Sequence, residues 1–520
     1  MKAFLMHRDR DFDPERILSR RERTFRREEH PELNLRRILP WNSRALRQDL
    51  SLDVLFAAMA KGETFLAEVA QAGLLTTLTD VDAIRYRQQV FVDCLKNEPV
   101  VREIYQIALD AVWHEMKNPL GFLKYPNGIL LHSINMLEMF AEVLKRLRVV
   151  AGQQQDTFRS EGFTRFFAMV RQELDDEYFA TIEGHLDQLR FRPGVLISGK
   201  LGKGNKGDNY VLRTPGTGEQ GWITRLRTKR AQFSFKIDPR DEAGAKALSE
   251  LNDEGINLVA NALAQSTDHI LSFFQMVRTE LAFYIGCLNL HHSLVRLGEP
   301  TCIPDPRPVG ERGLSASGLY NASLALSMRK EGVGNDLKGG GKNLFVITGA
   351  NSGGKSTLLG AIGAAYLMMQ AGMPVAAESF AADVCAGVFS HYKREEDATM
   401  EKGKWDEELG RMSEIIDQIK PDSLLLFNES FASTNEREGS EIAGQIVRAL
   451  LTRRIKIFFV THLYAFAKGL VEHGPDGTLF LRAERNSDGT RSFKLKEAAP
   501  LETSYGEDLY QSIFGAPDRP

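Results

Sequence analysis

A glycine-rich loop joins a hydrophobic run to a helical run near residue 350, and this arrangement leaves few folds open to the chain. The loop has the spacing Gly-x-x-x-x-Gly-Lys-Ser from Gly349 to Ser356, follows the β-like run Phe345–Thr348, and precedes the helical run Leu358–Met369. Glycine permits positive φ angles, so the backbone N–H groups and the helix amino terminus can approach a phosphate closely. The pattern predicts an α/β domain with a phosphate-binding loop after a strand.

The residue types in this loop indicate ATP and Mg²⁺ as cofactors. Lys355 is placed to reach the β- and γ-phosphates, and Ser356 is placed to bind Mg²⁺. The candidate nucleotide-binding residues are Gly349, Ala350, Asn351, Ser352, Gly353, Gly354, Lys355, Ser356 and Thr357.

A second hydrophobic run, Ser423–Phe427, leads into Asn428 and Glu429. P-loop ATPases of this layout mostly have Asp-Glu here, where Asp supports Mg²⁺ and Glu polarises the attacking water. Glu429 is therefore a candidate catalytic residue. Asn428 can hydrogen-bond a metal-bound water but adds no charge, so we expect weaker Mg²⁺ binding or slower turnover.

A third β-like run, Ile455–Val460, leads into Thr461 and His462. Open α/β sheets bind ligands beyond the carboxyl ends of their strands, so His462 is a candidate catalytic residue that senses the γ-phosphate. The alternative is a structural histidine.

The chain before residue 300 has a different pattern. Residues 51–190 show helical periodicity, for example over 52–74, over 81–95 and in the stripe formed by Leu130, Ile134, Leu137, Ala141 and Leu144. Residues 191–240 contain many glycines and short β-like runs, and 241–298 are helical again. We expect a helical domain over 51–300 with a small β-rich insert at 191–240, then a Pro- and Gly-rich boundary and a second domain over 315–520.

The insert carries the strongest basic cluster of the chain. Residues 199–230 hold eight Lys/Arg and two Asp/Glu, whereas the whole chain has a net charge of −3. A basic β-element can bind a nucleic-acid backbone, although an exposed hairpin kept soluble by lysine explains the pattern equally well. The candidate DNA contacts are Lys200, Lys203, Lys206, Arg225, Arg227, Lys229 and Arg230.

Residues 1–50 are Arg-rich and mixed in charge, and we interpret them as a loosely ordered arm or a solvated helix rather than a nucleic-acid contact. The chain has neither a signal-peptide pattern nor a clean apolar run long enough to span a membrane. Four scattered cysteines indicate free thiols. These features predict a cytoplasmic protein without a membrane partner.

Several motifs in order resemble the ATPase domain of the MutS DNA mismatch-repair proteins, over about residues 315–520. The loop is similar to TGPNMGGKST of that family, and Asn428–Gly439 is similar to its DE…GTST run. The remaining similar segments are Phe459–His462 (FATH in the family), Val333–Leu337, Thr503–Gly506 and Phe514–Pro517.

The resemblance implies a helical core and lever domain, a β-rich clamp inserted between lever helices, and an ABC-type P-loop ATPase domain. It further implies a homodimer through the ATPase domains that clamps double-stranded or branched DNA in repair or recombination. The family's mismatch-reading domain and small MutS-related nuclease domain are not found. The stretch 403–408, which corresponds to a family segment that reaches across the dimer, contains no Ser or Thr.

Two other functions stay open. Clamp-like arms also suit a nucleotide-gated factor that acts on structured RNA or ribosomes. Asn428 and the altered 403–408 stretch suit an ATP-binding scaffold with weak hydrolysis, whereas the retained Glu429 argues against it.

Overall fold

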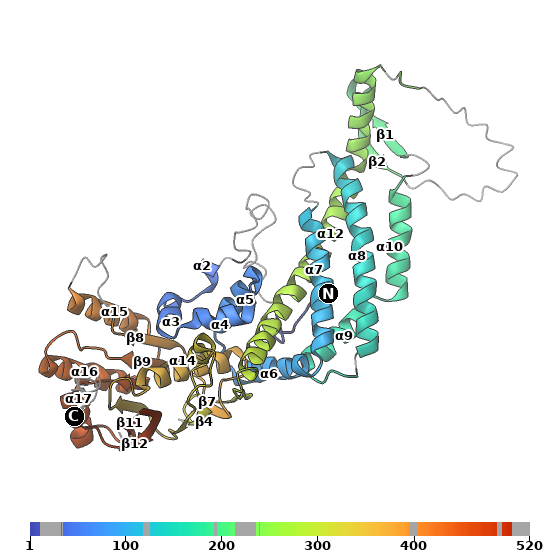
Figure 1. Ribbon diagram of the computed structural model, residues 1–520. Helices are drawn as coiled ribbons and strands as arrows, with labels where there is room; N and C mark the ends of the chain where they lie inside the picture. The colour runs from blue at the N-terminus through green and yellow to red at the C-terminus, as the bar shows by residue number, and fades with distance from the viewer. Residues whose placement is uncertain are drawn as a thin grey trace, which may run out of the picture.

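The computed structural model describes residues 1–10, 33, 35–117, 125–154, 156–191, 195–213, 236–238, 240–311, 313–394, 403–485 and 491–501. A sheet-containing part lies at one end, and long helices extend from it to a small hairpin at the other end (Figure 1).

The main sheet has six strands in the order β12-β11-β6-β10-β9-β8. Five strands are parallel, and β12 is antiparallel to β11 at the edge. Their bounds are β6 (Leu344–Thr348), β8 (Val388–Tyr392), β9 (Leu424–Asn428), β10 (Lys456–Val460), β11 (Thr478–Arg485) and β12 (Arg491–Glu497).

Both faces of this sheet are covered, which explains why the strands are continuous apolar runs. In β9, Leu424 and Leu426 join the core that contains α14 (Lys355–Ala371), while Leu425 and Phe427 face a second core. Three helices pack on the strands in this second core, namely α15 (Lys404–Gln418), α16 (Glu436–Thr452) and α17 (Tyr464–His473). The carboxyl edge of the strands stays available for a ligand.

A smaller sheet of four strands has the order β3-β7-β4-β5. It consists of β3 (Asp305–Arg307), β4 (Leu314–Leu319), β5 (Asn335–Lys338) and β7 (Ser379–Asp383), with α13 (Ala322–Met328) after β4. The strand β3 lies before residue 315 and pairs with β7, so the Pro-rich stretch after residue 301 contributes to this sheet.

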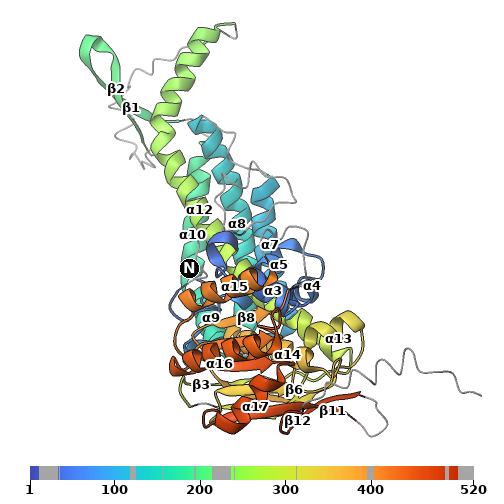
Figure 2. The same cartoon turned by 90° about the vertical axis from the view of Figure 1, so that its left-hand side faces the viewer.

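One helix, α12 (Glu242–Val295), runs through the helical part (Figures 1 and 2). Its 54 residues correspond to about 80 Å at 1.5 Å per residue. Helices α7 (Glu98–Lys117) and α8 (Pro126–Gln154) pack along it. The other helices are α2 (Leu35–Ile38), α3 (Ser43–Asp49), α4 (Leu52–Ala60), α5 (Thr64–Leu75), α6 (Val81–Lys96), α9 (Glu161–Glu173) and α10 (Asp176–Leu189). None of the described helices is long and apolar enough to cross a membrane.

The described part of 191–240 contains an antiparallel hairpin of β1 (Ile197–Leu201) and β2 (Gly207–Leu212), with a 3-10 turn at Lys203–Asn205. In both views the hairpin lies beside the amino-terminal half of α12, at the end far from the main sheet (Figures 1 and 2).

The sequence predicted a loosely ordered arm or a solvated helix over residues 1–50, whereas the described residues 1–10 pack partly against α12. Leu5 and Met6 are buried, and their backbone N–H groups both donate to Glu280 Oε2 on α12, at 2.6 and 3.1 Å. The hydroxyl of Tyr284 donates to Leu5 O at 2.6 Å. This short apolar segment packs because α12 offers it a buried acceptor and a buried donor. The arginines among residues 20–27 lie outside the described residues.

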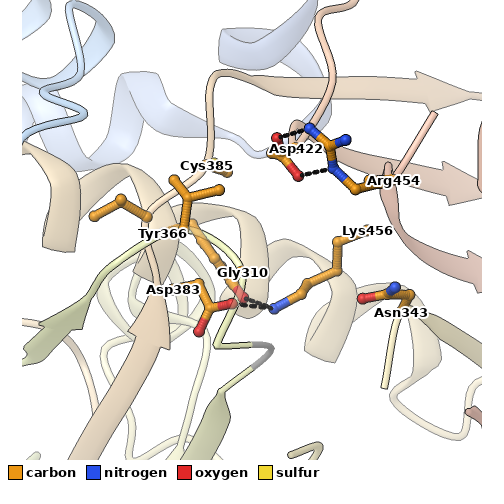
Figure 3. A pocket seen from close by; sticks show the side chains of 10 residues that line it. Gly310, Asn343, Tyr366, Asp383, Cys385, Asp422, Arg454 and Lys456 are labelled. Atoms are coloured by element: carbon orange, nitrogen blue, oxygen red, sulfur yellow. Dashed lines mark hydrogen bonds and ion pairs between the residues drawn. The ribbon is translucent and has the colours of Figure 1, made fainter. Parts of the chain in front are cut away.

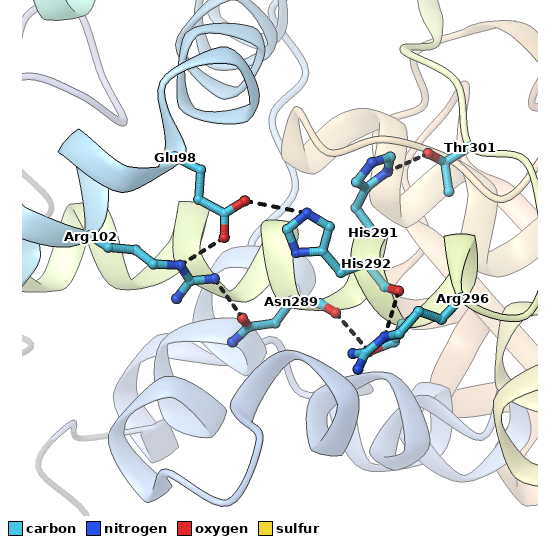
Figure 4. Close-up of polar contacts among 8 residues, drawn as sticks. Glu98, Arg102, Asn289, His291, His292, Arg296 and Thr301 are labelled. Carbon is cyan, nitrogen blue, oxygen red and sulfur yellow. Dashed lines mark hydrogen bonds and ion pairs between the residues drawn. The ribbon is translucent and has the colours of Figure 1, made fainter.

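A polar cluster joins the carboxyl-terminal end of α12 to its neighbours (Figure 4). Glu98 at the start of α7 accepts from Arg102 at 2.7 Å and lies 3.3 Å from His292 Nε2. His291 Nδ1 lies 2.7 Å from Thr301 Oγ1, in the segment that leads to β3. The cluster ties the end of the long helix to the chain that enters the smaller sheet.

Candidate active site

The glycine-rich loop lies between β6 and α14, at the carboxyl edge of the main sheet. Gly349 and Gly354 have φ angles of 110° and 89°, which only glycine adopts without strain. A Cβ atom on Gly353 would lie 2.7 Å from Ala483 Cβ and 2.9 Å from Ala350 O. The loop geometry therefore depends on these glycines.

Lys355 begins α14, and its side chain is curled under the loop. Its Nζ donates to Gly349 O at 3.0 Å and to Ala350 O at 2.9 Å. Burial lowers the pKa of Lys355 to about 8, while the negative charge of Glu429 acts in the opposite direction. No carboxylate among the described residues forms an ion pair with this buried ammonium, so the site fits an anion such as a phosphate.

Ser356 and Asn428 connect the first turn of α14 to the end of β9. Ser356 Oγ donates to Asn428 Oδ1 at 2.8 Å. A hydroxyl and a carbonyl-type oxygen are hard donors of the kind that Mg²⁺ binds directly or through water. The pair therefore fits a Mg²⁺ ion with retained waters.

Glu429 and His462 meet beyond the ends of β9 and β10. Asn428 and Val460 are register partners in these parallel strands, and Glu429 N donates to Val460 O at 2.9 Å. His462 Nε2 donates to Glu429 Oε1 at 2.9 Å. This hydrogen bond lowers the pKa of Glu429 against the effect of burial, so its carboxylate is ionised at neutral pH.

Two cavities flank the loop. A cavity of about 140 Å³ separates the loop from the stretch after β10 and is lined by Gly349, Asn351, His462 and Leu501. A larger cavity of about 430 Å³ lies on the other side of the loop. It is mostly apolar and is lined by Leu324, Met328, Val333, Phe493, and by Ser352, Gly354 and Thr357 of the loop and first helical turn.

The sequence pointed to Lys355, Ser356, Asn428, Glu429 and His462, and the structure brings all five to one edge of the sheet. It did not identify Phe493 or α13 as part of the site. Isolated apolar residues carry no motif, so only the folded chain, in which Phe493 and α13 line one cavity with Gly354, reveals them.

A further pocket of about 140 Å³ lies at the opposite edge of the sheet (Figure 3). Lys456 and Asp422 stand at the amino ends of β10 and β9. Arg454 pairs with Asp422 at 2.7 Å, and Lys456 Nζ lies 4.0 Å from Asp383 Oδ2. The two acidic and two basic side chains that line this pocket neutralise one another. The glycine-rich loop lies at the other end of the strands.

The described basic residues of the hairpin lie far from the main sheet and its candidate active site (Figure 1). Lys200 is in β1, and Lys203 and Lys206 are in the turn region; all three are exposed. Arg225, Arg227, Lys229 and Arg230 lie outside the described residues.

Comparisons with known proteins agree with the motifs. Residues 79–297 match the family described as MutS2 N-terminal domain, and residues 345–513 match MutS domain V. The protein named Endonuclease MutS2 of Streptococcus sanguinis is 28% identical over 183 residues, which cover 35% of this chain and 23% of that relative. Relatives with the same name in Streptococcus equi subsp. equi and Thermus thermophilus are each 33% identical, over 120 and 129 residues. These cover 23% and 24% of this chain but 15% and 17% of the relatives. The chain thus matches less than a quarter of the length of these curated relatives.

Proposed function

Because the chain belongs to the MutS family, we propose that it is an ATPase that clamps duplex, mismatched or branched DNA in repair or recombination. The observation that carries this proposal is the convergence at one sheet edge of a buried ammonium, a Ser–Asn pair and a His-bound carboxylate. The names of the relatives include an endonuclease activity, and we do not propose that activity for this chain.

The glycine-rich loop and Lys355 form the phosphate site of this proposal. The N–H groups of residues 349–357 and the α14 amino terminus hold the phosphate oxygens, and the Lys355 ammonium leaves the loop carbonyls for the β- and γ-phosphates. Ser356 and Asn428, which meet at 2.8 Å, are the residues that would hold Mg²⁺. When bound, ATP and Mg²⁺ supply the transferable phosphoryl group and the charge that neutralises it.

Glu429 acts on the attacking water in this proposal. Its ionised carboxylate accepts a hydrogen bond from the water and orients it for in-line attack. His462 holds that carboxylate at 2.9 Å and stands beside the cavity next to the loop, where it can sense the γ-phosphate.

The apolar cavity on the other side of the loop suits the nucleoside. Its walls combine Leu324, Met328, Val333 and Phe493 with the loop itself, and a flat base gains from burial against aliphatic and aromatic side chains. This placement puts the base next to the phosphate site, because Ser352, Gly354 and Thr357 line the same cavity.

The helix α12 is the lever of the proposed mechanism. Closure of two ATPase domains around ATP in a homodimer moves the carboxyl-terminal end of α12. Contacts of His292 with Glu98 and of His291 with Thr301 tie this end to α7 and to the segment that leads to β3 (Figure 4). The same helix reaches the hairpin that carries Lys200, Lys203 and Lys206, which bind the DNA backbone. ATP binding closes the clamp, and hydrolysis resets it.

Steady-state ATP hydrolysis tests this function. The purified protein is assayed alone and with homoduplex, mismatched duplex, four-way junction and structured RNA, with the Lys355→Ala variant as background. Stimulation by one DNA form supports the proposal and identifies the substrate class. Stimulation by RNA alone favours a factor that acts on structured RNA or ribosomes.

A scaffold that binds ATP with weak hydrolysis is the second candidate, because Asn428 places a neutral amide where a charged metal ligand is usual. Nucleotide binding without turnover above the Lys355→Ala background, with every polymer, would support this second candidate instead.

A further inference from the structure

The turn that carries Glu429 has an unusual backbone. Glu429 and Phe431 have φ angles of 54° and 64°, although side chains larger than glycine seldom adopt this left-handed region. Two such residues around Ser430 persist only where neighbouring groups hold the turn in place.

Side chains from β8 and α15 hold this turn. The Ser430 hydroxyl lies 2.6 Å from His391 O, to which it donates, and 2.8 Å from His391 Nδ1. His391 Nε2 donates to Glu408 O on α15 at 3.1 Å. The carboxylate of Glu408 accepts the backbone N–H of Phe431 through Oε1.

All members of this network are inside the protein. His391 and Ser430 are fully buried, and Glu408 is 2% exposed. Burial and the nearby positive charge of Arg411 lower the pKa of His391 to about 4, so its ring is neutral. Glu408 is the acidic member of the network, and a hydrogen bond from a backbone N–H to an ionised carboxylate is stronger than one to a neutral acceptor.

Phe431 fixes the turn from the other side. Its ring is fully buried and stacks on His391, with centroids 5.5 Å apart. A Cβ atom on Gly439 of α16 would lie 2.2 Å from Phe431 O. The turn is thus clamped between α15, α16 and β8, and the Glu429 side chain leaves it toward His462.

We propose that Glu408 is a positioning residue for hydrolysis, which holds the turn through the Phe431 N–H so that the Glu429 carboxylate faces the glycine-rich loop. The inference rests on the proposed ATPase function. Because Glu408 belongs to α15, this one carboxylate makes the geometry of Glu429 depend on the position of that helix.

Variants of Glu408 separate positioning from folding. Glu408→Ala removes the acceptor, Glu408→Gln keeps a neutral acceptor oxygen, and Glu414→Ala on the exposed side of α15 is the matched control. For each, kcat and KM for ATP, the Kd of a fluorescent ATP analogue and the thermal unfolding temperature are measured.

We expect Glu408→Ala to lower kcat by about 10-fold or more, because small displacements of a catalytic group are costly, with a Kd within about 2-fold of wild type. Glu408→Gln should recover most of kcat, and Glu414→Ala should change nothing. If Glu408→Ala does not fold, Ser430→Ala, which removes only one hydroxyl, should show the same split between kcat and Kd.

Three outcomes would overturn the inference. Wild-type kcat in Glu408→Ala, or in Ser430→Ala where the former does not fold, refutes positioning while leaving the ATPase intact. Equal loss of kcat and nucleotide affinity would reduce Glu408 to a structural residue. Wild-type turnover no higher than that of Lys355→Ala would overturn both the proposed function and this inference.

Discussion

The hydroxyl of Ser356 donates a hydrogen bond of 2.8 Å to Asn428 Oδ1, which joins the first turn of α14 to the end of β9 through two neutral groups. P-loop ATPases usually have an aspartate at the position of Asn428. Asparagine and aspartate differ only in the amide group, so an aspartate oxygen can occupy the same position. The charge at this place can therefore be changed with little change in shape.

Asn428→Asp should strengthen Mg²⁺ binding. The added carboxylate attracts the cation and still accepts from Ser356, so we expect the Mg²⁺ concentration for half-maximal ATP hydrolysis to fall by about 3- to 10-fold. Mg²⁺ titration of the steady-state rate measures this change. Asn428→Ala, which removes the oxygen, should move the titration in the opposite direction, and identical curves for Asn428→Asp and wild type would contradict the assignment.

Glu429→Ala should bind ATP as wild type does but lose turnover, by about 100-fold or more. The carboxylate orients water and does not hold phosphate, so its loss affects kcat. Nucleotide affinity from a fluorescent analogue and the steady-state rate together test this split. Lys355→Ala should lose binding and turnover together, and an equal loss of affinity in Glu429→Ala would remove Glu429 from the role given to it.

Much of the site was predictable because its residues directly follow hydrophobic runs. Residues at the ends of parallel strands share one edge of a sheet, so the order of motifs already placed Glu429 near the loop. The contacts of Glu408 with Phe431 and of His391 with Ser430 join residues 23 and 39 positions apart. No local pattern marks such contacts, so they emerge only from the folded chain.

The helical part shows the same difference between local and distant signals. Periodicity predicted a helical stretch over 52–74, and the structure divides it into α4 and α5 at Lys61 and Gly62, which both have positive φ. Gly62 was a visible sign of that break. The burial of Leu5 and Met6 was not visible, since it depends on Glu280 of α12.

The affinity for ATP should fall as pH rises above about 8. Burial lowers the pKa of Lys355 to about 8 in the free protein, so the ammonium loses its proton as pH increases through that value. Bound phosphates stabilise the ammonium and raise this pKa, so binding near pH 8.5 should take up a proton.

Isothermal titration calorimetry in buffers of different ionisation enthalpy measures that proton. The guanidinium in Lys355→Arg stays protonated, so any ATP binding by this variant should take up fewer protons than binding by the wild type. Equal uptake by both proteins would assign the proton to another group.

The packing of α5 on α12 predicts a stability difference between two glycines. A Cβ atom on Gly73 would lie 2.4 Å from Phe283 Cδ2, whereas Gly184 on α10 has nothing within 4 Å. Gly73→Ala should destabilise the protein by about 1–3 kcal/mol through overpacking. Gly184→Ala should stabilise it by up to about 1 kcal/mol, because alanine favours the helix. Urea unfolding followed by circular dichroism compares them, and similar midpoints would contradict the close contact.

The lysines of the hairpin should set the salt dependence of DNA binding. Lys200, Lys203 and Lys206 are exposed on a narrow hairpin, and each phosphate that a lysine neutralises adds about 0.9 to the slope of log K against log salt concentration. Replacing all three by Gln should therefore reduce the slope by up to about 3 and weaken binding to every DNA sequence alike.

Fluorescence anisotropy of labelled duplex from low to moderate salt measures both effects. The matched control replaces Lys96, Lys420 and Lys468, which are exposed elsewhere in the chain, and removes the same charge without touching the hairpin. An equal loss of slope in the control would show that the net charge of the protein, and not the hairpin, determines the attraction. An unchanged slope in the hairpin variant would place the DNA contacts elsewhere on the chain.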